Sequence, residues 1–217
     1  MTAVNRQEAL RYLGYRKDQE VDPATRELLE EGIAELEETA APRWVYGIRE
    51  MAGTNQGIRL CGKEITSRRL AKHLTGCRQV VIFAATLGAE VDRLIGRYSR
   101  LQMSRAVVLQ AAAAAMIESY CDECQHILER QAAEKGLYVR SRFSPGYGDF
   151  AITHQADILS WLHTEKKIGL TMTDSYMLVP SKSVTALLGL TEEAGSCHTV
   201  KCLSCESIDC PFRRTET

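Results

Sequence analysis

The sequence has no excess of basic residues and no long hydrophobic run. Its 27 Lys and Arg residues are balanced by 28 Asp and Glu residues, which gives a formal net charge of −1. A protein that binds nucleic acid needs a basic surface to neutralise phosphates, so we expect no nucleic-acid partner. The longest uninterrupted apolar stretch, residues 111–117, is much too short to span a bilayer. We therefore expect no membrane partner either.

Two further signals are missing. The first eight residues carry no apolar segment of the kind that a signal peptide has, so we expect a cytoplasmic protein. No strand-like run leads into a Gly-x-Gly-x-x-Gly turn. This absence, and the lack of a strict alternation of strands and helices, argue against a doubly wound nucleotide-binding fold.

Cysteine is the residue type in excess, with eight among 217 residues. A chain of this length can bury a full core without disulfides, and a cytoplasmic environment keeps thiols reduced, so metal ligands or buried thiols are expected. Four follow the spacing Cys-x4-Cys-x2-Cys-x4-Cys near the C-terminus: Cys197, Cys202, Cys205 and Cys210. Four thiolates this close can surround a zinc ion or an iron–sulfur cluster, and Pro211 after the last of them favours the cluster. The alternative is a tail whose cysteines are incidental.

The other four cysteines show no such pattern. Cys121 and Cys124 lie inside an alanine-rich helical stretch, where small side chains usually belong to the core. No helix N-terminus is expected near them to lower the pKa of either thiol. Cys61 and Cys77 are single thiols at the ends of short predicted elements. We interpret these four as structural thiols.

Hydrophobic periodicity and capping signals predict a mixture of helices and strands. Asn5 with Glu8 begins a first helix, and Asp22-Pro23 begins a second, whose glutamates are interpreted as a solvated face. Residues 80–85 form a continuous apolar run that is typical of a buried central strand. Further strands are expected at 43–49, 57–61, 137–143, 170–173, 175–179 and 183–190, and further helices after Thr66 or Ser67, after Gly88, at 102–135 and at 153–163. The predicted class is α+β, with a central twisted, mainly antiparallel sheet and flanking helices.

The most constrained stretch is residues 142–149, Arg-Phe-Ser-Pro-Gly-Tyr-Gly-Asp. Pro145-Gly146 favours a turn with glycine at positive φ, and Gly148 permits a second reversal. The planar fork of Arg142 suits a carboxylate, and Tyr147 offers a flat ring and a hydroxyl group. On residue types alone, an ordinary surface turn with a solvated arginine explains the pattern better.

The pattern Arg-x-x-x-Gly-Tyr, with proline before the glycine and an acid-containing helix upstream, resembles the S-adenosylmethionine-binding signature of the activation domain of cobalamin-dependent methionine synthase. Residues 171–184 are similar to the Leu-Thr-Glu-Ser, Pro and Ser-Val pattern that follows in that domain. The similarity covers residues 105–190, with several motifs in the right order, and the N-terminal half is more similar to the small stand-alone bacterial versions. The resemblance implies an α+β domain with a twisted antiparallel sheet.

The same resemblance implies a site for S-adenosylmethionine. The implied contacts are Arg142 for the methionine carboxylate, the backbone of Ser144 and Gly146, Tyr147 at the edge that faces the corrin, and Glu118 near the ligand. Asp122, one helical turn after Glu118, is the alternative acid. No general base is required, because the methyl acceptor is a reduced cobalt centre that another protein supplies.

The implied function is the reactivation of oxidised cobalamin on a partner. In the family, one electron and a methyl group from S-adenosylmethionine convert cob(II)alamin to methylcobalamin. The sequence has no Asp-x-His-x-x-Gly signature, so the corrin is expected to come from a partner, either methionine synthase or another corrinoid protein. A flavodoxin or ferredoxin type of reductant would supply the electron. The chain would be at most a component of this methyltransferase activity.

Two departures from the family keep another class of function open. The N-terminal aspartate and the C-terminal tyrosine segment that contact the ligand in the multidomain enzyme have no match here. The alternative is a non-catalytic metal-binding adaptor, or an electron-transfer accessory, that docks on a corrinoid protein. In either case we expect residues 1–195 to form one module, with the helices of residues 1–42 packed on it, and residues 196–217 to form a cysteine-rich metal-binding tail.

Overall fold

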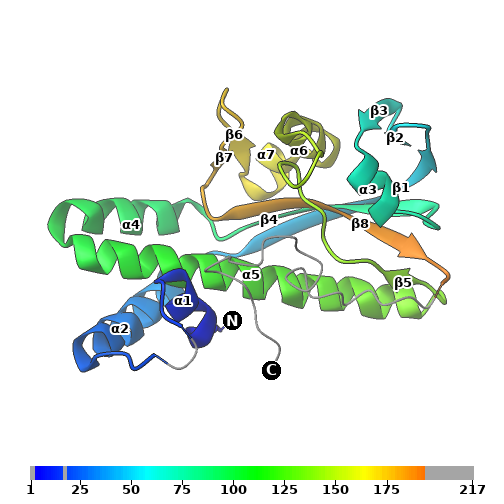
Figure 1. The fold of residues 1–217 in the computed structure, drawn as a ribbon. Coiled ribbons are helices and arrows are strands. Elements are labelled where there is room, and N and C mark those ends of the chain that lie inside the picture. The colour runs from blue at the N-terminus through cyan, green and yellow to red at the C-terminus, as the bar shows by residue number, and fades with distance from the viewer. Residues whose placement is uncertain (1–2, 17–18, 194–217) are drawn as a thin grey trace.

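An antiparallel sheet of six strands, with helices on both faces, forms the part of the chain that the computed structural model describes, residues 3–16 and 19–193 (Figure 1). The strand order is β3-β2-β1-β4-β8-β5, and each neighbouring pair is antiparallel. The strands are β1 Arg43–Gly53, β2 Gly57–Leu60, β3 Lys63–Thr66, β4 Gln79–Thr86, β5 Tyr138–Val139 and β8 Ser183–Thr191. Strands β6 Thr171–Met172 and β7 Leu178–Val179 form a separate hairpin. The predicted α+β class is confirmed.

The helices divide between the two faces of the sheet. Their bounds are α1 Arg6–Tyr12, α2 Pro23–Thr39, α3 Arg68–His73, α4 Ala89–Leu101, α5 Met103–Ala133, the 3-10 helix η1 Ile152–His154, α6 Gln155–Leu162 and α7 Thr164–Ile168. One face is covered by α5 with α1, α2 and α4, and the other by α3, α6 and α7 (Figure 1). The sheet therefore separates two hydrophobic clusters.

The central strand β4 supplies both clusters because successive side chains point to opposite faces. Val81, Phe83 and Ala85 pack toward α5, whereas Val80, Ile82 and Ala84 pack toward α6 and α7, and all six are buried. A strand that is covered on both faces has no solvent side to carry polar residues. The continuous apolar run of residues 80–85 is thus explained, and its prediction as a central strand is confirmed.

Helix α5 lies across the sheet and is packed by other helices on its outer side. Its Ala112 and Ala113 are completely buried, and small side chains allow neighbouring elements to approach closely. Helix α2 comes close to α5 at Gly32, where a Cβ atom would lie 3.3 Å from Val108 Cγ1. The prediction of a long core helix is confirmed. Among the described residues, no helix is both long and apolar enough to cross a membrane.

One interpretation of the second helix is wrong for Glu35. Its carboxylate accepts hydrogen bonds from Arg97 Nη2 at 2.6 Å, Arg105 Nη2 at 3.0 Å and the Tyr98 hydroxyl at 3.1 Å. These contacts join α2 to α4 and α5. Glu35 is therefore part of a helix–helix contact and does not belong to a solvated face.

Several boundaries differ from the sequence predictions. Strand β3 and helix α7 were not expected, and the strand expected at residues 137–143 is reduced to β5 and one bridge between Phe143 and Leu187. Cys61 (φ 51°) and Gly62 (φ 77°) form the turn between β2 and β3. Two consecutive positive φ values suit a two-residue hairpin, but Cys-Gly is not one of the residue pairs that signal it.

Candidate functional site

The candidate site begins with the Gly-Tyr loop, residues 142–150, between β5 and η1. Phe143 ties the start of the loop to β8, since its N–H and C=O both pair with Leu187 at 2.9 Å. Gly146 N donates to Phe150 O at 2.7 Å, and Phe150 N donates to Tyr147 O at 3.1 Å. The loop is therefore closed by its own backbone, and Gly146 (φ 88°) and Gly148 (φ 61°) have the predicted positive φ values.

Asp149 attaches the end of the loop to the first turn of α3. Its carboxylate accepts from Ser67 Oγ at 2.5 Å and from the backbone N–H of Arg68 at 2.8 Å and Arg69 at 3.2 Å. Gly148 allows this close approach, because a Cβ atom there would lie 2.6 Å from Arg69 Cδ. No motif in the sequence predicts this role of Asp149. Its partners are about eighty residues earlier in the chain, so no local pattern could identify them.

The contacts of Asp149 predict a pH dependence. Hydrogen bonds from Ser67 and from the Arg68 and Arg69 backbone lower the pKa of Asp149 below its ordinary value of 3.8, although partial desolvation opposes them. A carboxylate with a lowered pKa stabilises the folded state above the unfolded-state pKa, and this contribution is lost as the pH falls through the folded-state value. We expect wild type to be more stable than Asp149→Asn at neutral pH, with the difference shrinking below about pH 4.

Urea unfolding at a series of pH values measures this difference directly. The matched control is Asp174→Asn, which removes an exposed carboxylate between β6 and β7 and should leave stability nearly unchanged. A constant difference between wild type and Asp149→Asn from pH 6 to pH 3 would contradict the role of the ionised Asp149.

Tyr147 projects from the loop toward solvent. It is 49% exposed, and its ring packs edge-on against Phe143 with the centroids 5.2 Å apart. Ile152 lies beside the same turn and is 41% exposed. The loop therefore presents an aromatic ring and an aliphatic side chain at the surface, while Phe143 and Phe150 are buried beneath it.

Arg142, unlike Tyr147, points away from solvent, and its guanidinium is bound to three side chains of α5. Its Nη2 atom donates to Asp122 Oδ1 at 2.7 Å and to Glu118 Oε2 at 3.2 Å, and its Nη1 atom donates to Gln125 Oε1 at 3.1 Å. The side chain is only 8% exposed. Burial by itself would lower the pKa of the guanidinium, but Cys121, Asp122 and Glu118 outweigh burial and the pKa is raised. Arg142 is thus a fixed, nearly buried cation, and the alternative of a solvated arginine is excluded.

Comparisons with known proteins show the family and the fold of the chain. Residues 67–208, about two thirds of the chain, match the family model described as "Vitamin B12 dependent methionine synthase, activation domain". The chain belongs to this family. A crystal structure of the MetH reactivation domain bound to AdoHcy has a TM-score of 0.66 with the chain at 17% identity, and the match covers 89% of this chain and 76% of that one. At this identity the likeness shows the fold. A search of curated proteins finds no match.

Within this activation-domain fold, the predicted site residues fall into two groups. Ser144, Gly146 and Tyr147 lie together in the turn of the loop. Glu118, and Asp122 as its alternative, both contact Arg142, so the structure does not choose between them. Gln125 was not predicted. Its spacing of seven residues from Glu118 places it on the same helical face, and that spacing is a signal that could have found it.

The buried thiols near Arg142 are not reactive groups. Burial raises the pKa of Cys124 to about 11, and burial raises the pKa of Cys121 further still. Both thiols are therefore neutral at physiological pH, as structural thiols should be. Across residues 3–16 and 19–193, no cluster of three or more His, Cys, Asp or Glu side chains could hold a metal ion. The predicted ligands Cys197, Cys202, Cys205 and Cys210 lie outside the described residues.

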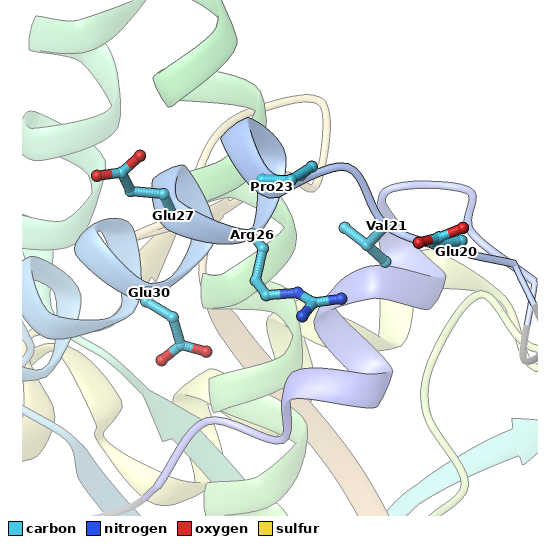
Figure 2. Close-up of a pocket in the computed structure, with 6 residues that line it drawn as sticks. All are labelled: Glu20, Val21, Pro23, Arg26, Glu27 and Glu30. Atoms are coloured by element: carbon cyan, nitrogen blue, oxygen red, sulfur yellow. The ribbon is translucent and has the colours of Figure 1, made fainter.

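A surface hollow of about 410 Å³ lies at the start of α2, apart from the Gly-Tyr loop. It is lined by Glu20, Val21, Pro23, Arg26, Glu27 and Glu30 (Figure 2). Figure 2 shows that the acidic side chains do not converge on one point. None of the lining residues comes from α5 or from the loop. The hollow therefore adds nothing to the site around Arg142.

Proposed function

We propose that the chain is a stand-alone S-adenosylmethionine-binding module that supports reactivation of cob(II)alamin on a partner methionine synthase or another corrinoid methyltransferase. The observation that carries the proposal is the placement of Arg142, a nearly buried cation at the base of an Arg-x-x-x-Gly-Tyr loop. Membership of the activation-domain family supports it. The bound AdoHcy of the solved reactivation domain supports the choice of ligand class.

The residues of the site match the charges of the ligand. S-adenosylmethionine carries a carboxylate, an ammonium and a sulfonium group, so a site needs a cation, an anion and an aromatic or apolar surface. We assign Arg142 to the carboxylate, Glu118 to the ammonium and Tyr147 to the side that faces the corrin, with the backbone of Ser144 and Gly146 in contact with the ligand. The protein's contribution is to position the methyl group.

The chemistry itself belongs to the partner's cobalamin. An electron from a flavodoxin or ferredoxin type of reductant would reduce the partner's cob(II)alamin. The methyl group would then pass from the sulfonium to the cobalt and leave S-adenosylhomocysteine. No side chain of this site needs to move a proton in that transfer.

The cysteine-rich tail is part of the proposal. Residues 1–195 would form the module, and Cys197, Cys202, Cys205 and Cys210 would hold zinc or an iron–sulfur cluster, of which the cluster would suit a reaction that consumes one electron. Metal and sulfide analysis of anaerobically prepared protein distinguishes the two. A preparation with neither zinc nor iron in stoichiometric amount would contradict the metal site.

A second candidate function is a metal-binding or electron-transfer adaptor that docks on a corrinoid protein and transfers no methyl group. One observation favours this adaptor function. The charge of Arg142 is already neutralised by Glu118 and Asp122, so Arg142 does not need a ligand for charge balance. Calorimetric titration of the full chain with S-adenosylmethionine and with S-adenosylhomocysteine separates the candidates. Binding of both, but not of adenosine, is expected for the module. No binding of either, with or without a corrinoid partner, would leave the adaptor.

A further inference from the structure

Arg142, which we assign to the carboxylate of the ligand, already binds the carboxylate of Asp122. Arg142 Nη2 is 2.7 Å from Asp122 Oδ1, the distance of a strong charge-assisted hydrogen bond. The contact to Glu118 is longer, at 3.2 Å. Asp122 is therefore the main partner of the nitrogen that a ligand carboxylate would need.

Exposure increases from Arg142 outward. The side chain of Arg142 is 8% exposed, that of Glu118 35% and that of Asp122 53%. A ligand that approaches the guanidinium from solvent therefore meets Asp122. The carboxylate of Asp122 is more than half exposed, so it can turn into water and be solvated there when another carboxylate takes its place on Arg142. Asp122 is thus the partner that can be replaced most easily.

The third partner keeps the guanidinium in place during such an exchange. Gln125 Oε1 accepts from Arg142 Nη1 at 3.1 Å, and Gln125 Nε2 donates to Glu129 Oε1 at 2.9 Å. The amide is neutral, so it does not compete with a carboxylate by charge. Nη2 can change its partner while Nη1 remains held.

We propose that Asp122 is a specificity residue that occupies the carboxylate position on Arg142 and is displaced by the carboxylate of the ligand. The proposal rests on the proposed function and concerns the same site. Arg142, Glu118 and Asp122 together carry a net charge of −1, so a third carboxylate is accepted only when Asp122 moves away or when the ligand also brings positive charge. The site would therefore favour a zwitterionic amino-acid group over a simple carboxylate.

The test compares two ligands that differ in the amino-acid group. S-adenosylhomocysteine has the carboxylate, and 5′-methylthioadenosine has neither carboxylate nor ammonium. Each is titrated by calorimetry into the full-length wild type, Asp122→Asn and the charge control Glu134→Gln, an exposed change in the turn that follows α5. Asp122→Asn is expected to bind S-adenosylhomocysteine about three- to fivefold more tightly than wild type, with methylthioadenosine unchanged. Glu134→Gln should bind both ligands as wild type does.

A second substitution at the same position controls for structural damage in Asp122→Asn. Asp122→Glu keeps the competing charge and is expected to bind S-adenosylhomocysteine with wild-type affinity. Unchanged or weaker binding of S-adenosylhomocysteine by folded Asp122→Asn would overturn the exchange and leave the proposed function standing. Absence of S-adenosylhomocysteine binding in wild type and in every variant would overturn both.

Discussion

Replacement of Arg142 by alanine is expected to weaken S-adenosylhomocysteine binding by roughly 30- to 150-fold. The guanidinium is the nearly buried cation of the Gly-Tyr loop, and a charge-assisted hydrogen bond to a carboxylate is worth about 2–3 kcal/mol. The substitution also leaves Glu118 and Asp122 without their cation, so the remaining site repels the ligand carboxylate. Calorimetric titration of wild type and Arg142→Ala measures the ratio of dissociation constants.

Two controls show whether a loss of binding in Arg142→Ala comes from the loss of the guanidinium. Arg142→Lys retains the charge but loses the planar fork, so it is expected to bind with intermediate affinity. Thermal unfolding must show that Arg142→Ala is folded. We expect this result because the carboxylates of Glu118 and Asp122 are partly exposed and water can solvate them. Equal affinities of wild type and Arg142→Ala for S-adenosylhomocysteine would remove Arg142 from the binding site.

Replacement of Phe150 by alanine is expected to lower the free energy of unfolding by about 3–5 kcal/mol. The ring is 1% exposed and lies 6.2 Å from the ring of Phe143 and 5.4 Å from that of His154. Its loss would leave a cavity beneath the Gly-Tyr loop, which is closed by the hydrogen bonds of Phe150 to Gly146 and Tyr147. Urea denaturation measures the change in stability.

The conservative change Phe150→Leu keeps most of the apolar volume and should cost much less, about 1–1.5 kcal/mol. If the loop is positioned by this packing, the alanine variant should also bind S-adenosylhomocysteine more weakly under conditions where it remains folded. A loss of stability below 1 kcal/mol in Phe150→Ala would show that the loop does not depend on the buried ring.

The sequence by itself determined the elements whose signals are local. The run of residues 80–85 identified β4, because a strand that is buried on both faces must be apolar throughout. The caps at Asn5 and Asp22 identified the starts of α1 and α2, since a side chain three residues before a free N–H can accept from it. The positive φ of Gly146 and Gly148 was equally local. The resemblance to the family rested on several local motifs that follow one another in the right order over residues 105–190.

Only the tertiary structure decided the partners of the polar side chains. Asp149 meets Ser67, Glu35 meets Arg97 and Arg105, and Arg142 meets Asp122, all across separate elements. Charged residues are compatible with a solvated face or with a buried pair, and no local pattern distinguishes the two states. Packing distinguishes them, because burial makes a partner obligatory for Arg142. For that reason the resemblance to the family could name Arg142, Glu118 and Asp122 as site residues, whereas the ion pairs of Arg142 with the two carboxylates were not predictable from the sequence.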